Sequence, residues 1–122
     1  MEIKQLQLKN YRNCKSVSLN FSKQKILIIG KNAQGKTNIL ESIYLLSSLK
    51  SPRTSSLVDM INFESKSFEI NAEINKNDTS IEMHISYNND KKRELKLNGI
   101  KTNISNFKNV LKTVLFSTTC LL

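Results

Sequence analysis

The chain has 122 residues, which suits one domain or part of a larger one, and its 39% hydrophobic and 24% charged content is typical of a soluble globular protein. No apolar run approaches the roughly 20 residues that span a bilayer, and the N-terminus lacks the continuous apolar core of a secretory signal. We therefore expect no membrane contact and a cytoplasmic location. The two cysteines, Cys14 and Cys120, are far apart and are interpreted as unlinked thiols in a reduced compartment.

Charge is more informative than length. The chain has 19 Lys and Arg against 10 Asp and Glu, a net charge of +9. This excess favours polyanionic partners, either nucleic acid or nucleotide phosphates. A lysine- and asparagine-rich composition can also arise from biased base composition, so charge alone leaves DNA binding open.

The N-terminal third predicts three strands. Residues 3–9 alternate at the strand period, and a second alternating run places Val17, Leu19 and Phe21 on one side. Residues 25–29 form a continuous branched apolar run that ends at Gly30, which is typical of a central strand buried on both faces.

A phosphate-binding loop follows the third predicted strand. Gly30 and Gly35 are separated as in Gly-x-x-x-x-Gly-Lys-[Ser/Thr], and Lys36 and Thr37 complete the motif. Residues 38–49 are apolar at helical spacing without Gly or Pro, which predicts a helix covered on both sides, and Pro52 ends it. The strand–loop–helix context that the motif requires is therefore present.

The second half predicts an antiparallel meander over about residues 66–98. Three strand-like runs, 68–74, 81–87 and 95–97, are separated by turn signals at 77–78 and 88–90. A short helical stretch at 57–61 precedes them, and the apolar run 110–116 could return to the main sheet. The predicted fold class is α/β, a phosphate-loop NTPase with an inserted antiparallel meander.

The loop chemistry assigns roles to its residues. Gly30 and Gly35 let the backbone approach phosphate oxygens, and the amides of residues 33–37 lie at the positive end of the following helix. Lys36 supplies a charge to the β- and γ-phosphates, and the Thr37 hydroxyl is a Mg²⁺ ligand. The predicted ATP and Mg²⁺ site comprises Gly30, Lys31, Asn32, Ala33, Gln34, Gly35, Lys36 and Thr37.

Other polar residues carry weaker signals. His84 lies on the polar side of its predicted strand and is interpreted as a surface histidine. Glu41 and Glu64 have no partner carboxylate at acid–base spacing, and no Cys or His cluster suits zinc. Arg53 lies on a Ser- and Thr-rich loop beyond the helix, where it is either a solvated side chain or a contact to phosphate or DNA.

The chain contains three ordered motifs: the N-terminal pattern Leu6-x-Leu8-x-Asn10-Tyr11-Arg12-Asn13, the segment GKNAQGKTNILESIYLLS, and Ser51-x-Arg53-Thr54. Together these motifs resemble the RecF family of DNA replication and repair proteins. Asn32 and Asn38 match the version of the loop found in RecF and its SMC-like relatives. The resemblance extends from residue 1 to about residue 116.

The resemblance implies the first lobe of an ABC-type ATPase head that dimerises around two ATP molecules and binds single-stranded or gapped DNA. In this family the protein works with RecO and RecR to load recombinase. By position, Arg12 and Asn13 would lie near the nucleotide phosphates, and Arg53 would occupy a loop that senses DNA.

The chain also departs from the family. After residue 117 it lacks the family's Pro-Glu-Asp stretch, and it has neither a second acidic motif (Walker B) nor a Leu-Ser-x-Gly-Gln-like signature. We therefore expect the N-terminal part of a RecF-like head, truncated or frameshifted, that binds nucleotide without turning it over. Two alternatives stay open: a different SMC-like ATPase coupled to a nuclease, and a vestigial fragment without activity.

Overall fold

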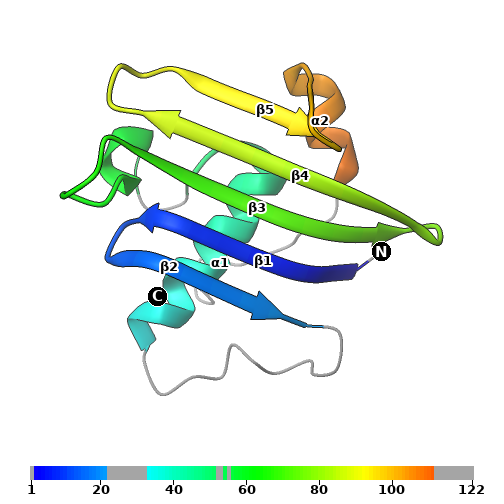
Figure 1. Cartoon of the computed structure of the whole chain (residues 1–122), viewed down its shortest axis with the longest axis horizontal. Helices are drawn as coiled ribbons and strands as arrows, with labels where there is room; N and C mark the ends of the chain where they lie inside the picture. The colour runs from blue at the N-terminus through cyan, green and yellow to red at the C-terminus, as the bar shows by residue number, and fades with distance from the viewer. Residues whose placement is uncertain (1, 22–32, 52–53, 55, 112–122) are drawn as a thin grey trace.

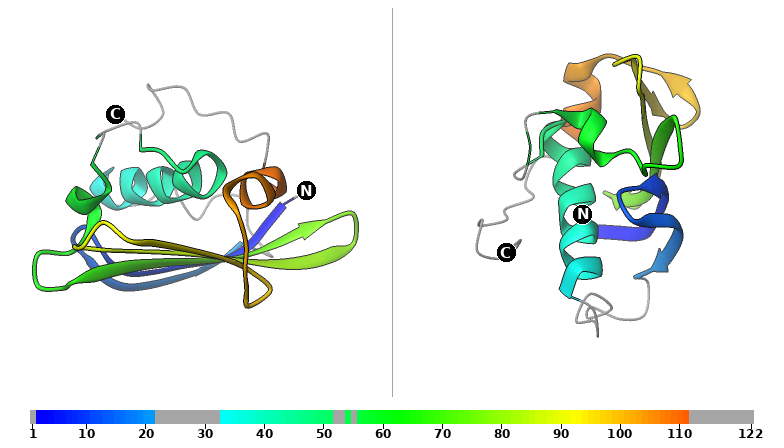
Figure 2. Two further views of the ribbon diagram at one scale, coloured as in Figure 1. Left: turned by 90° about the horizontal axis from the view of Figure 1, so that it is seen from above. Right: turned by 90° about the vertical axis from the view of Figure 1, so that its left-hand side faces the viewer.

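A computed structural model of the chain describes residues 2–21, 33–51, 54 and 56–111. In this part of the chain, six strands form one antiparallel sheet in the order β2-β1-β3-β4-β5-β6. Both α-helices lie on the same face of the sheet, and the opposite face is open (Figure 1, Figure 2). In chain order the elements are β1 (Glu2–Tyr11), β2 (Cys14–Asn20), α1 (Ala33–Ser48), the 3₁₀ helix η1 (Leu57–Met60), β3 (Ser67–Lys76), β4 (Thr79–Asn88), β5 (Arg93–Leu97), β6 (Ile100–Lys101) and α2 (Ile104–Val110).

The strand period of the sequence sets which side chains face the helices. In β1, Leu6 and Leu8 are buried, and in the neighbouring strand β3 every second residue from Phe68 to Ile74 is buried. Leu6 lies opposite Ala72, and Leu8 lies opposite Ile70. The predicted meander is confirmed, and the structure adds that it joins the N-terminal hairpin in one sheet, because β1 pairs with both β2 and β3.

The helix that the sequence predicts from residue 38 begins earlier. α1 starts at Ala33, so residues 33–37 form its first turns rather than an extended loop. The prediction that both sides are covered is confirmed for residues 37–49, because every one of them is buried or half-buried. The predicted strand at 25–29 lies outside the described residues.

The end of the described chain differs from the prediction. Residues 110 and 111 do not return to the sheet as a strand: Val110 is the last residue of α2, and both it and Leu111 are buried against the core. The side chain of Asn103 caps α2 by accepting a hydrogen bond from the amide of Asn106 at 2.7 Å. The rest of the predicted run, 112–116, lies outside the described residues.

The open face of the sheet is polar and carries a concentration of acidic residues. Glu69 and Glu73 of β3, Glu82 of β4 and Glu94 of β5 each lie next to at least one buried residue of their strand, and Glu73 lies directly opposite Glu82. Opposed like charges destabilise a strand pair.

In the described residues, no helix has the length and apolar content needed to cross a membrane.

Candidate nucleotide site

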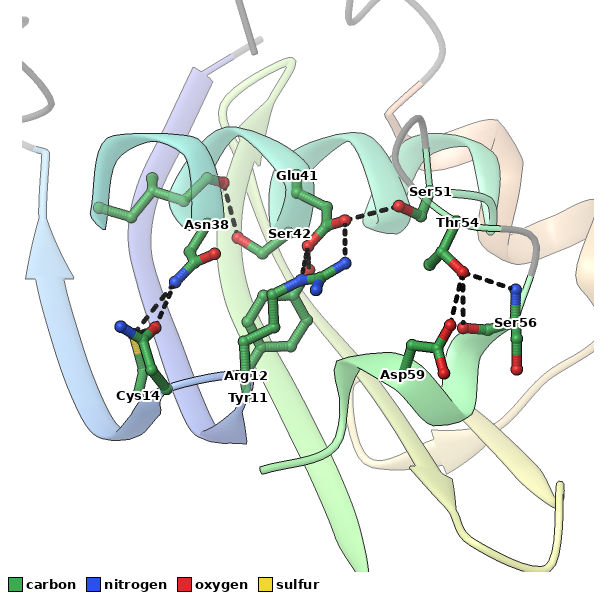
Figure 3. Close-up of polar contacts among 12 residues, drawn as sticks. Tyr11, Arg12, Cys14, Asn38, Glu41, Ser42, Ser51, Thr54, Ser56 and Asp59 are labelled. Atoms are coloured by element: carbon green, nitrogen blue, oxygen red, sulfur yellow. Dashed lines mark hydrogen bonds and ion pairs between the residues drawn. The ribbon is translucent and has the colours of Figure 1, made fainter. Parts of the chain in front are cut away.

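The turn between β1 and β2 contacts the helix that follows the predicted phosphate loop. Arg12 and Asn13 form this turn, and their side chains reach Glu41 and Asn38 of α1 (Figure 3). Glu41 lies one helical turn beyond Thr37, on the same side of the helix and about 6 Å further along its axis. Residues far apart in sequence are thus brought together next to the first turns of α1.

Arg12 and Glu41 form a bidentate ion pair. The Arg12 Nε donates to Glu41 Oε1 at 2.6 Å, and Nη2 donates to Oε2 at 2.8 Å. The carboxylate is fully buried, whereas the arginine side chain remains 23% exposed. The hydrogen bonds to Glu41 raise the pKa of Arg12, against desolvation, which lowers it.

Two hydroxyl groups also contact the Glu41 carboxylate. Tyr11 donates its hydroxyl to Oε1 at 2.6 Å, and Ser51 donates to Oε2 at 2.6 Å. A buried carboxylate is costly unless it is paired and hydrogen-bonded, and each oxygen here accepts at least two hydrogen bonds from described residues. Glu41 is therefore held in position by the neighbouring residues Tyr11 and Arg12 and by Ser51, which follows α1.

The backbone of Arg12 is fixed independently of its side chain. Arg12 has a φ of 52°, in the left-handed region that is uncommon for residues other than glycine. Its amide donates to the carbonyl of Met60 at 2.6 Å, and the Asn62 side chain donates to the carbonyl of Arg12 at 2.6 Å. Contacts from the last residue of η1 and from the segment after it thus hold the turn in its strained conformation.

A second contact anchors the turn nearer the start of α1. The buried Asn38 donates from Nδ2 to Asn13 Oδ1 at 2.6 Å. The thiol of Cys14 lies 3.8 Å from the same oxygen, and Cys14 is a free cysteine. The structure therefore brings Arg12, Asn13 and the first turns of α1 together.

Several predicted site residues lie outside the described part of the chain. These are Gly30, Lys31, Asn32 and Arg53. Cys120, which is predicted to be an unlinked thiol, also lies outside the described residues. The backbone of residues 33–36 forms the first turn of α1, and Thr37 is half-buried in the second.

The described residues around the start of α1 are suited to bind a phosphate group. The first turn of α1 has no acidic residue, and a helix N-terminus concentrates amide donors and positive potential. Arg12 adds a partly exposed guanidinium with five N–H donors, of which its pair with Glu41 uses two. For Mg²⁺, the Thr37 hydroxyl is a suitable hard oxygen ligand.

Sequence reasoning missed Glu41, which it considered only as half of a carboxylate pair. The partner of Glu41 is a cation, Arg12, 29 residues earlier in the chain. A buried-helix pattern that includes one acidic residue was the available signal, because a carboxylate inside an apolar helix needs a partner. Ser51 belongs to the motif Ser51-x-Arg53-Thr54, but the sequence predicts no role for its hydroxyl group.

His84 lies on the open face, on the polar side of β4 as predicted, but it is half-buried rather than fully exposed. Its Nδ1 lies 2.7 Å from Asn71 Oδ1 of the neighbouring strand β3. Desolvation lowers the pKa of His84, and the charge of Lys96 adds to this, against Glu69 and Glu94, which raise it.

Comparisons with known proteins identify the family of the chain. The model of the AAA ATPase domain family matches residues 1–119. The chain belongs to the AAA ATPase domain family. Such a match over nearly the whole chain supports reading the described strands and helices as part of an ATPase fold.

Relatives and solved structures refine the assignment within this family. The chain is 40% identical over 120 residues to the DNA replication and repair protein RecF of Natranaerobius thermophilus, a match that covers 96% of this chain and 31% of the relative. A solved structure of the recombination mediator protein RecF with ATP has a TM-score of 0.70 and 29% identity, covering 83% of this chain and 27% of that one. A structure from work on ATP-driven dimerisation of SMC ATPases has a TM-score of 0.77 and 26% identity, covering 89% and 76%.

These matches confirm the resemblance to RecF and the fold class, an ATPase head with an antiparallel meander. The chain spans about a third of the length of the curated relatives that it matches.

Proposed function

We propose that this chain binds ATP with Mg²⁺ and is the nucleotide-binding part of a RecF-like ATPase that acts on DNA in recombinational repair. The observation that carries the proposal is the contact between the β1–β2 turn and α1. In this contact the Arg12 guanidinium pairs with Glu41, which lies one helical turn beyond Thr37 in α1. The 40% identity to a RecF protein supports the same conclusion.

Each residue of the proposed site has a distinct task. The loop and the first turn of α1 (residues 30–37) surround the phosphates with amide donors, and Lys36 adds a point charge at the β- and γ-phosphates. Thr37 is the protein ligand of Mg²⁺. Arg12 contributes a second cation from the side, and Asn13 fixes the turn through Asn38.

The proposed macromolecular partner is single-stranded or gapped DNA. The net charge of +9 favours it, and the similar solved structure belongs to a protein described as a recombination mediator. RecO, RecR and a second copy of the head, joined in an ATP-dependent homodimer, are partners proposed from the family. Absence of hydrolysis by this chain alone stays a prediction from its sequence, as does the cytoplasmic location.

A second candidate is the head of another SMC-like ATPase. The SMC structure favours it, because this chain covers 76% of that chain with a TM-score of 0.77. The identity to RecF is higher, at 40% against 26%, and extends over 96% of this chain, which favours the first candidate.

The test of the nucleotide site is titration of the chain with fluorescently labelled ATP in the presence of Mg²⁺. Replacing Lys36 with Ala removes a charge-assisted contact of roughly 1.5–3 kcal/mol, so the affinity should fall about tenfold or more. The matched control is Lys50→Ala, which removes one exposed positive charge just beyond the other end of α1. Equal affinities of the two variants would contradict the proposal.

The proposed DNA contact of Arg53 is tested against another single charge. Arg53→Ala should weaken binding of single-stranded DNA more than Lys91→Ala, where Lys91 is exposed in the β4–β5 turn. Fluorescence anisotropy over a salt series separates a specific contact from bulk charge, because counterion release makes all such binding salt-dependent. Equal losses of DNA affinity in the two variants would show that only the net positive charge contributes to binding, and the specific contact of Arg53 would be contradicted.

A further inference from the structure

We propose that Glu41 is a positioning residue for nucleotide binding, which orients the Arg12 guanidinium toward the phosphates and is itself held in place by Tyr11 and Ser51. This inference rests on the proposed function, since it names a residue that controls the same site. The sequence alone assigns no role to Glu41.

The bidentate geometry fixes direction as well as distance. Two parallel N–H···O bonds hold the plane of the guanidinium relative to the carboxylate, which a single contact would not do. The three remaining N–H donors of Arg12 then point in set directions, and the side chain is 23% exposed. An arginine restrained in this way binds a phosphate without losing the rotamer freedom that a free side chain would lose.

The Glu41 carboxylate is itself restrained by hydrogen bonds. Its carboxylate is fully buried, and it accepts hydrogen bonds from the hydroxyls of Tyr11 and Ser51 at 2.6 Å each. Tyr11 belongs to β1, and Ser51 follows α1 in the chain. The position of the guanidinium is thus set jointly by the sheet, the helix and the segment that follows the helix (Figure 3).

The contacts of the Arg12 backbone separate this role from a purely structural one. The turn is held by Met60 and Asn62 through the amide and carbonyl of Arg12, not through its side chain. Loss of the carboxylate charge should therefore leave the turn in place and release only the guanidinium.

Glu41→Gln is the substitution that tests this most directly. Glutamine has the same shape and can keep an oxygen at the Oε1 position, where it still accepts from Tyr11 and from the Arg12 Nε. Its amide nitrogen then replaces Oε2, where it can donate to Ser51 but opposes the N–H of Arg12 Nη2. One of the two bonds that orient the guanidinium is lost, together with the charge.

The measurement is affinity for labelled ATP with Mg²⁺ in a double-mutant cycle of Glu41→Gln and Arg12→Gln, below the unfolding temperature of every variant. We expect Glu41→Gln to weaken ATP binding about fivefold or more in the wild-type background and to have little further effect in the Arg12→Gln background. A residue that only stabilises the fold would lower thermal stability in both backgrounds without this coupling in affinity. Unchanged affinity in Glu41→Gln, or equal losses in the two backgrounds, would overturn the inference.

Ser51→Ala keeps the test decisive if Glu41→Gln does not fold. It removes one restraint on Glu41 and leaves the ion pair, so we expect a smaller loss of ATP affinity, about twofold, that disappears in the Arg12→Gln background. A loss that persists in that background would contradict the inference. The Lys36→Ala variant distinguishes a failure of the proposed function from a failure of this inference. If the wild-type chain does not bind ATP, or binds it independently of Lys36, the proposed function is contradicted and this inference with it. If only the coupling is absent, the inference alone fails.

Discussion

Two glutamates on opposite sides of the same sheet, each paired with positive charges, have very different surroundings. Glu41, on the helix that covers one face, is fully buried and makes a bidentate pair with Arg12. Glu94, on the open face, is 38% exposed, and the amino groups of Lys96 and Lys101 lie 3.5 Å from its oxygens. A charge on the covered face must be paired and hydrogen-bonded, and this pairing restrains both partners. On the open face water can replace a lost partner, so the loss changes the free energy of unfolding little.

The largest expected effect is on the covered face. Glu41→Ala removes a buried carboxylate together with its hydrogen bonds to Tyr11, Arg12 and Ser51, so the free energy of unfolding should fall by about 3–5 kcal/mol. Chemical denaturation followed by circular dichroism measures it. Glu94→Ala is the matched control, and similar losses in both variants would remove the distinction between the two faces.

The second prediction concerns a single hydroxyl group. Tyr11→Phe removes the hydrogen bond to the buried Glu41, and we expect a loss of about 2 kcal/mol in the free energy of unfolding. Tyr87→Phe is the control, since both rings pack beside Phe68 and no hydrogen bond is found for the Tyr87 hydroxyl among the described residues. If the two variants lose stability equally, the network around Glu41 contributes less than its geometry implies.

The third prediction uses pH on the open face. The pKa of His84 lies below its ordinary value of about 6.5, mainly because of desolvation, so the unfolded chain takes up the proton first as pH falls. Stability should therefore decrease as the pH drops from about 6.5 toward the lower folded pKa, and His84→Gln should abolish this part of the decrease. Because His84 is the only histidine of the chain, an NMR titration gives its folded pKa directly. A value at or above 6.5 would contradict the expectation.

The smallest effect is expected for Glu94→Gln. Desolvation raises the pKa of Glu94, but the charges of Lys96 and Lys101 outweigh it and lower the pKa. The group is well exposed and screened by solvent, so the melting temperature should stay within experimental error of the wild type. A decrease as large as that of Tyr11→Phe would show that the open face is not freely solvated.

The sheet was largely predictable because its signal is local. Strand period and turn residues identify β1 and the meander, and Asn77 and Asp78 adopt the positive φ angles that their turn signal suggested. Helix α2 was not predicted, because it has seven residues and only Phe107 and Val110 are buried, too few to show a period. The apolar run that includes Val110 and Leu111 suggests instead a segment that could return to the main sheet.

The candidate site was only partly predictable for a related reason. The phosphate loop is a contiguous motif, and Arg12 and Asn13 came from the resemblance to RecF. The pairing of Arg12 with Glu41 depends on the left-handed turn at Arg12 and on contacts from Met60 and Asn62, which no single stretch of sequence encodes. Contacts between distant segments had to be seen in the structure.

The pairing of β1 with β3 has a consequence for synthesis. α1 packs on a sheet whose central strands include β3 and β4, so it leaves the ribosome before the strands that bury its apolar side chains exist. At about 5–20 residues per second, the residues between the end of α1 and the end of β5 take several seconds to appear. During that interval the helix next to the phosphate loop exposes its leucines to the cell, and closing β1 onto β3 requires a long loop, which slows folding. We therefore expect this N-terminal segment to depend on chaperones during synthesis more than its small size suggests.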